Sequence, residues 1–140
     1  MVAVLREKIL KRDMDLIRGL LLKLEALPLG LGDVVTLAPD APEIAVPGYD
    51  DAQIDYHLTL IREVGFIDDA GARPMLGTGF RALTWAGHDF LDSVRDPTIW
   101  GATKEGARKA GGFSVELLAA LAKGLIKKKI EEHTGVALEL

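Results

Sequence analysis

The chain has 140 residues, of which 49% are hydrophobic and 27% charged, and its 17 basic and 21 acidic side chains give a net charge of −4. This length and balance fit one soluble domain with a buried core and exclude the composition of a disordered chain. The absence of cysteine excludes a disulfide framework, a thiolate metal site and a cysteine nucleophile, and favours a reducing compartment.

The N-terminal segment, residues 1–10, alternates apolar and charged residues. A secretory signal needs an uninterrupted apolar stretch and a small-residue cleavage site, so we do not expect one here. The richest apolar run, Leu117 to Ala122, is far shorter than a membrane span. We therefore expect a cytoplasmic protein without a membrane partner.

The first predicted helix covers Met14 to Leu27, with Asp13 as its N-cap and Pro28 as its stop. Apolar residues recur there at spacings of three and four, at Leu10, Met14, Ile17, Leu21 and Leu24. Two short runs follow, Val34 to Leu37 and Glu43 to Val46, which we predict to be short strands or a loose hairpin.

The second predicted helix spans residues 50–64 and has the clearest start signal of the chain. Asp50 and Gln53 match a capping box, and Tyr49 and Ile54 occupy the positions of a hydrophobic staple. The helical period assigns Ile54, Leu58 and Ile61 to the buried face, and Ala52, Tyr56, Thr59 and Glu63 to the solvent face. Gly65 ends the helix.

A hairpin and three helices are predicted for the rest of the chain. Phe66 to Asp68 and Arg81 to Trp85 are strand-like, and a glycine-rich connection, Asp69 to Phe80, reads as a long mobile tip between them. Thr84 caps a helix to Val94, Asp96 with Pro97 starts another that ends near Gly111, and Ser114 caps the last one, to Glu132.

This order of elements predicts an α+β fold, a winged helix-turn-helix with additional C-terminal helices. We expect a single domain over residues 1–140, with a core over about residues 11–96 and a helical extension over about 97–133. One core should then bury six apolar side chains together: Ile54, Leu58, Ile61, Ile67, Leu83 and Leu91.

Several strings of the chain resemble known families. The run His57 to Ile67 followed by Leu83, Thr84, Gly87 and Leu91 is similar to the recognition helix and wing of MarR-type and PadR-type regulators. The segments 11–18, 56–58, 83–85 and 87–92, and Arg95 and Asp96 with Trp100, resemble a bacterial and phage family, domain of unknown function 2513, often met in prophages and mobile elements. About ten residues precede Lys11 beyond that pattern, and the tip lacks a strong basic run.

In a regulator of this fold, the exposed face of the second helix would enter the major groove of double-stranded DNA. The residues predicted to contact nucleic acid are Tyr56, Thr59, Arg62, Arg73 and Arg81. Residues 29–75, however, carry two basic and nine acidic side chains, a net charge of −7, and this charge repels phosphate. The alternative is a protein-interaction adaptor on the same scaffold that uses its acidic face.

No catalytic, metal or cofactor site is predicted. The histidines at 57, 88 and 133 lie on separate elements without a metal-ligand spacing, and we expect His57 and His88 to be packing or hydrogen-bonding positions. The glycines at 71, 77 and 79 lack the Lys-Ser or Lys-Thr of a phosphate loop. An enzyme is therefore not expected.

The last predicted helix is apolar nearly all round in its first half. Either the core buries it on two sides, or it forms a homodimer interface, which we favour. The cluster Lys127 to Lys129 near its end complements the helix dipole, which we favour over a contact with phosphate or a membrane.

Overall fold

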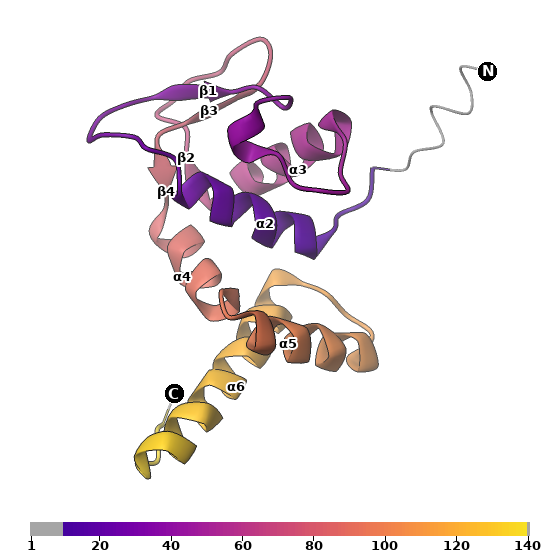
Figure 1. The fold of residues 1–140 in the computed structure, drawn as a ribbon, viewed down its shortest axis with the longest axis vertical. Coiled ribbons are helices and arrows are strands. Elements are labelled where there is room, and N and C mark those ends of the chain that lie inside the picture. Colours follow the sequence, from indigo (N-terminus) through magenta and orange to yellow (C-terminus); the bar gives the residue numbers. More distant parts are fainter. Residues whose placement is uncertain (1–9, 140) are drawn as a thin grey trace, which may run out of the picture. The chain divides into compact units, whose positions relative to one another are not determined.

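The computed structural model describes residues 10–139, so the predictions for residues 1–9, including the extra segment before Lys11, lie mostly outside it. The chain divides into two compact units, one ending at Gly87 and one beginning at His88. Figure 1 shows the elements of each. The expectation of a single domain stays a prediction.

The first unit begins with helix α2, Met14–Glu25. The carboxylate of Asp13 caps it by accepting hydrogen bonds from the backbone amides of Asp15 and Leu16, as predicted. The helix ends two residues before the predicted Leu27, and Leu10 lies outside it with 52% of its surface exposed. The buried face of α2 consists of Met14, Leu16, Ile17, Leu20, Leu21 and Leu24.

The two runs after α2 differ from the predicted pair of strands. Strand β1, Val35–Leu37, forms as expected, but Pro42–Ile44 is a 3₁₀ turn, η1. Proline lacks an amide hydrogen and has a fixed φ, which suits the first position of a turn and weakens a strand. The prediction of a second strand was therefore wrong, and η1 instead buries Ile44 against α2.

Helix α3, Asp51–Glu63, confirms the predicted second helix and its capping box. The carboxylate of Asp50 accepts from the amide of Gln53 at 2.9 Å, and the Gln53 side chain accepts from the amide of Asp50 at 2.9 Å. Ile54, Leu58 and Ile61 are buried, and α3 packs against α2.

The strands after α3 form two antiparallel pairs. Strand β2, Ile67–Asp68, pairs with β4, Ala82–Leu83, in the register Ile67 opposite Leu83. Strand β3, Thr78–Phe80, pairs with β1, so that Val35 lies opposite Phe80. Only Arg81 separates β3 from β4 along the chain.

Strand β3 corrects the prediction that all of residues 69–80 is a mobile tip. Its three residues are buried. A Cβ at Gly79 would lie 2.8 Å from the Cβ of Ala72, so the absence of a side chain allows the returning strand to pass close to the loop. The glycine indicated close backbone packing here, not a loose loop.

Helix α4, Trp85–Val94, runs from the first unit into the second and is followed by α5, Pro97–Ala110, and α6, Val115–Thr134. The predicted caps of α4, α5 and α6 are present, because Thr84, Asp96 and Ser114 each accept backbone hydrogen bonds from the first turn. Within the second unit α5 packs against α6. No helix within residues 10–139 has the length and apolar character needed to cross a membrane.

All six side chains predicted for the core are buried: Ile54, Leu58, Ile61, Ile67, Leu83 and Leu91. The first five belong to the first unit and Leu91 to the second. The structure is thus a mixed α+β arrangement of helices with two small antiparallel sheets.

Candidate functional site

The solvent-facing side of α3 carries two of the residues predicted to contact nucleic acid. Tyr56 and Thr59 are half-buried, and the Thr59 hydroxyl donates to the carbonyl oxygen of Asp55 at 3.2 Å. Asp51, Asp55 and Glu63 are exposed on the same helix. This face therefore combines two polar groups that could bond to DNA with three carboxylates that repel it.

A buried histidine joins α3 to the start of α2. His57 is only 2% exposed, and its Nε2 accepts a hydrogen bond of 2.8 Å from the backbone amide of Asp13. Its Nδ1 must then carry the proton, which it donates to the carbonyl oxygen of Gln53 at 2.8 Å. His57 is thus a hydrogen-bonding position, as the sequence indicated.

This bond places two basic residues beside α3. Lys11 and Arg12 are exposed and lie within two residues of the Asp13 amide. The ring of Tyr56 stands edge-on to that of His57, with the centroids 5.5 Å apart. The backbone just before α2 therefore lies at the turn of α3 that carries His57. Sequence reasoning missed this contact, because no local signal links residues 44 positions apart.

Asp13 also holds Tyr49 at the entrance to α3. The Tyr49 hydroxyl donates to Oδ2 of Asp13 at 2.7 Å. Burial, the hydrogen bond to Asp13 and the negative charges of Asp13 and Asp15 raise the pKa of Tyr49 from 10.0 to about 12. Asp13 thus caps α2, fixes Tyr49 and, through its amide, fixes His57.

The raised pKa of Tyr49 gives a pH prediction. The folded state favours the neutral phenol, so the stability from this contact is complete below pH 10 and is lost as the pH rises through about 12. Absorbance at 295 nm should show a tyrosine that ionises near pH 12, and Tyr49→Phe should remove it. Asp13→Asn should move that ionisation to lower pH. If the absorbance increase of the wild type is complete by pH 11, the contact between Tyr49 and Asp13 is absent in solution.

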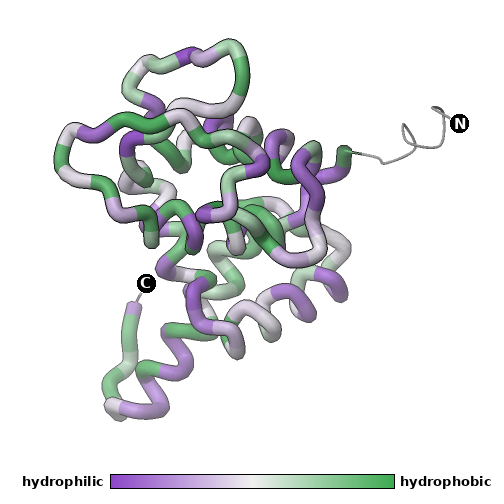
Figure 2. The backbone as a smooth tube through the Cα atoms, turned by 45° about the horizontal axis from the view of Figure 1, so that its top comes forward, coloured by the Kyte–Doolittle hydropathy of each residue, from purple (hydrophilic) through white to green (hydrophobic). Residues whose placement is uncertain are grey.

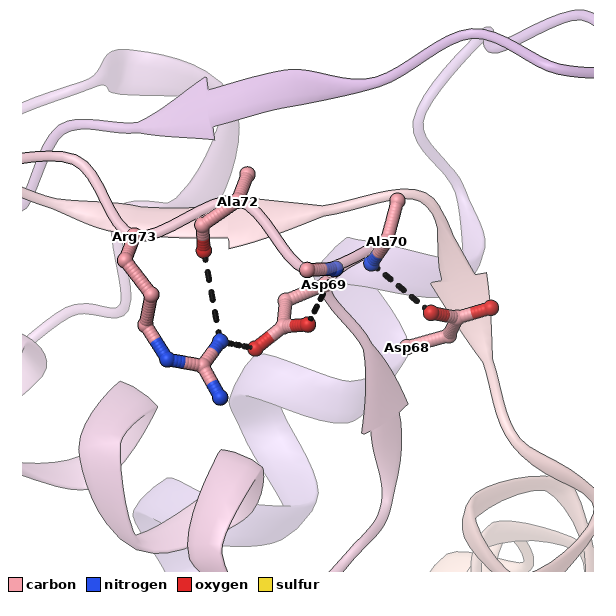
Figure 3. Close-up of polar contacts among 6 residues, drawn as sticks. Asp68, Asp69, Ala70, Ala72 and Arg73 are labelled. Carbon is pink, nitrogen blue, oxygen red and sulfur yellow. Dashed lines mark hydrogen bonds and ion pairs between the residues drawn. The ribbon is translucent and has the colours of Figure 1, made fainter.

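The predicted arginine Arg73 lies in the loop between β2 and β3, and Arg81 lies between β3 and β4. Arg73 pairs with Asp69, and Arg81 pairs with Asp68, with Nη2 at 2.6 Å and Nε at 3.1 Å from Oδ2. Figure 3 shows the first pair and the backbone amide of Ala70, which donates to Asp68 at 2.8 Å. The amide of Gly71 donates to Asp69, also at 2.8 Å. Arg73 is therefore paired within the loop, and Arg81 is paired with the last residue of β2.

These contacts lower the pKa of both aspartates. For Asp68 the main cause is the hydrogen bond from Arg81, followed by the amide of Ala70. For Asp69 the main cause is the amide of Gly71, followed by Arg73, and the charge of Arg62 on α3 adds to it. The loop base thus lies within electrostatic range of the C-terminal part of α3.

Of the five residues predicted to contact nucleic acid, the structure places Tyr56, Thr59 and Arg62 on α3, Arg73 in the loop between β2 and β3, and Arg81 between β3 and β4. Arg73 and Arg81 are paired, so they neutralise Asp68 and Asp69 and add little positive charge to the surface. Among residues 10–139, no group of histidine and acidic side chains is arranged to hold a metal ion.

The second unit contains the helix predicted to form a homodimer. In α6 Leu118 and Ala122 are buried, Leu117 and Leu121 are half-buried, and Ile130 is 40% exposed. Its last turns are largely hydrophilic in Figure 2 and include Lys127, Lys128 and Lys129. Packing on α5 therefore explains part of its apolar surface, and the homodimer stays a prediction.

Comparison with known proteins gives one family. A family model described as "Hypothetical protein (DUF2513)" matches residues 11–114. A protein of Haemophilus influenzae, described as an uncharacterized protein, is 32% identical over 124 residues, which cover 86% of this chain and 99% of that protein. No solved structure matches the chain.

Proposed function

Because the chain belongs to the DUF2513 family, whose description names no activity, we propose a function from the geometry: its first unit is a winged-helix module of a regulatory protein and binds duplex DNA. The order of elements supports this fold. A helix, strand β1 and a short turn precede α3, and a hairpin follows it, with β1 against β3 and β2 against β4.

The observation that carries the DNA proposal is the hydrogen bond between the Asp13 amide and His57. It brings the backbone that directly follows Lys11 and Arg12 to the turn of α3 that carries His57, and we expect the two basic side chains to extend toward Tyr56. A helix in a DNA groove can bond to the duplex through its hydroxyl groups, while basic side chains beside the helix contact the phosphates. Tyr56 and Thr59 would contact the duplex, and Lys11 and Arg12 would supply the attraction.

The carboxylates of α3 oppose this attraction. Asp51 and Asp55 would face phosphate oxygens, so binding should be weak near physiological salt and should fall steeply as salt rises. Since Arg73 and Arg81 already neutralise aspartates, they should contribute little to affinity.

Fluorescence anisotropy with a random-sequence duplex tests this proposal. Replacing Lys11 and Arg12 together with alanine should weaken binding roughly tenfold and reduce the slope of log affinity against log salt by about 2, because two phosphate contacts are lost. Lys23→Ala, at the other end of α2, is the matched control and should change neither the affinity nor the salt slope.

Two further pairs of substitutions locate the contact on α3. Tyr56→Ala with Thr59→Ala should weaken binding, whereas Asp51→Asn with Asp55→Asn should strengthen it by removing repulsion. Tight binding that none of these changes affects would move the contact to another element, such as the lysines of α6.

A second candidate is an adaptor that binds a basic protein partner. The specific observation in its favour is that Arg73 and Arg81 are paired with aspartates while three carboxylates of α3 are exposed. A folded protein that shows no DNA binding at low salt would overturn the DNA proposal and favour this adaptor.

A further inference from the structure

A protonated His57 does not fit the two hydrogen bonds that its ring makes in the structure. Nδ1 donates to the carbonyl oxygen of Gln53, and Nε2 accepts from the backbone amide of Asp13, each at 2.8 Å. In a charged imidazole both nitrogens carry a proton, so both donate and neither accepts. A proton on Nε2 would therefore face the hydrogen of the Asp13 amide, and one of the two groups would have to move.

The surroundings of His57 make this conflict costly. The side chain is only 2% exposed, and its helix packs against α2. A charge that is buried without a partner is strongly disfavoured, because little water reaches it. Uptake of a proton at Nε2 therefore requires an acceptor close to the ring.

The acceptor that the fold supplies is the carboxylate of Asp13. It belongs to the same residue as the amide that His57 binds, so rotation about Cα–Cβ and Cβ–Cγ brings an oxygen toward Nε2. In the structure, Oδ1 accepts from the amides of Asp15 and Leu16, and Oδ2 accepts from the Tyr49 hydroxyl. A carboxylate bonds more strongly to a charged donor than to such neutral donors, so a protonated ring competes with them.

Three charged side chains flank Asp13 along the chain. Lys11 and Arg12 are exposed, and their positive charges oppose a further positive charge on the ring. Asp15, in the first turn of α2, is exposed as well. Of the two carboxylates at this end of α2, that of Asp13 is therefore the one whose backbone already contacts the ring of His57.

The titratable groups on the other elements around His57 offer no such acceptor. The carboxylate of Asp50 caps α3, and that of Asp68 on β2 pairs with Arg81. Tyr56 stands edge-on to the ring, and strand β3 has no titratable side chain. The helical period directs four further charged side chains of α3 away from His57: Asp51, Asp55, Arg62 and Glu63.

We propose that His57 and Asp13 form a pH-sensitive switch at the junction of α2 and α3. At neutral pH the Asp13 amide donates to the ring, while its carboxylate caps α2 and holds Tyr49. When solvent supplies a proton to Nε2, the carboxylate turns to accept the new N–H, and the cap and the bond to Tyr49 are given up together. The exchange takes place between pH 8 and pH 5, where histidine side chains ordinarily change charge. It does not depend on whether the chain binds DNA.

Nuclear magnetic resonance of the full chain, labelled with ¹⁵N, tests this exchange. At pH 8 the Nδ1 signal of His57 should have the chemical shift of a protonated ring nitrogen, and the Nε2 signal that of an unprotonated one. As the pH falls to 5, Nε2 should become protonated, and the amide signals of Asp13 and Asp15 should move over the same range. Carboxylates ordinarily take up protons only at lower pH. The titrations of the exposed His88 and His133 are internal controls and should leave these amide signals in place.

Two variants separate the parts of the switch. His57→Gln keeps an acceptor for the Asp13 amide but takes up no proton, so the amide signals of Asp13 and Asp15 should stay fixed between pH 8 and pH 5. Asp13→Ser keeps a side chain that caps α2 but has no carboxylate, so a protonated His57 loses its partner. Its midpoint of urea unfolding should therefore fall by about 0.5 M more than that of the wild type between pH 8 and pH 5. Adding His57→Gln to Asp13→Ser should remove this excess.

Several results would overturn the switch. A His57 ring that is protonated at Nε2 at pH 8 means that the bond to the Asp13 amide is absent. A ring that stays uncharged down to pH 5, or that gains a proton while the amide signals of Asp13 and Asp15 do not move, means that no exchange occurs. If the stability of Asp13→Ser follows that of the wild type at every pH, the carboxylate is not the partner of the charged ring. None of these results bears on DNA binding by α3, which the anisotropy measurements test separately.

Discussion

Replacing Gly87 with alanine should destabilise the protein by about 3 kcal/mol or more, since the new methyl group has no space. Gly87 lies in the first turn of α4, against the turn that joins α3 to β2. A Cβ there would lie 3.0 Å from the carbonyl carbon of Phe66 and would overlap its oxygen.

The Phe66 backbone cannot move aside at low cost. Its carbonyl oxygen accepts a hydrogen bond from the Thr84 amide at 3.0 Å, and the Thr84 hydroxyl bonds to the carbonyl oxygen of Gly65. Phe66 itself is buried. Alanine at 87 would therefore have to displace the Phe66 carbonyl group and break its hydrogen bond with the Thr84 amide.

A second glycine provides the control for this prediction. Gly101 lies in α5, and a Cβ there would have no atom within 4 Å. Gly101→Ala should therefore stabilise the helix by about 0.5 to 1 kcal/mol, because alanine loses less backbone entropy. Urea unfolding, monitored by circular dichroism, measures the stability of both variants. A Gly87→Ala variant within about 1 kcal/mol of the wild type would show that α4 does not start against Phe66.

Local signals explain why the helices were predictable from the sequence. Asp13, Asp50, Asp96 and Ser114 are caps that act within three residues, and proline and glycine mark the neighbouring ends. The pairing of β2 with β4 was also predictable, because both runs flank one connection.

Contacts between distant segments were not predictable. Gly77 and Gly79 locally predict a loop where strand β3 forms, and the partner strand β1 lies about forty residues earlier. Likewise, nothing near Lys11 shows that it lies beside α3, because that position depends on the bond between Asp13 and His57. The pairing of Arg73 and Arg81 with aspartates needed the loop conformation as well.

His57 allows the contribution of that long-range bond to be measured separately. In His57→Gln the side-chain oxygen is as many bonds from Cβ as Nε2, so it can accept from the Asp13 amide in place of the ring. In His57→Asn the side-chain nitrogen replaces Nδ1 and keeps the bond to Gln53, but nothing accepts from Asp13. We expect losses of about 1 kcal/mol for glutamine and about 2 to 4 kcal/mol for asparagine.

The same two variants connect stability with the proposed function. If the bond to Asp13 holds Lys11 and Arg12 beside Tyr56, His57→Asn should also weaken DNA binding, at a temperature where both variants are folded by circular dichroism. His57→Gln should bind like the wild type. Equal losses of stability would mean that the Asp13 amide finds water as an alternative partner. Equal DNA affinity at unequal stability would mean that the two basic residues do not depend on His57 for their position, and the DNA contact would then have to be sought on other elements.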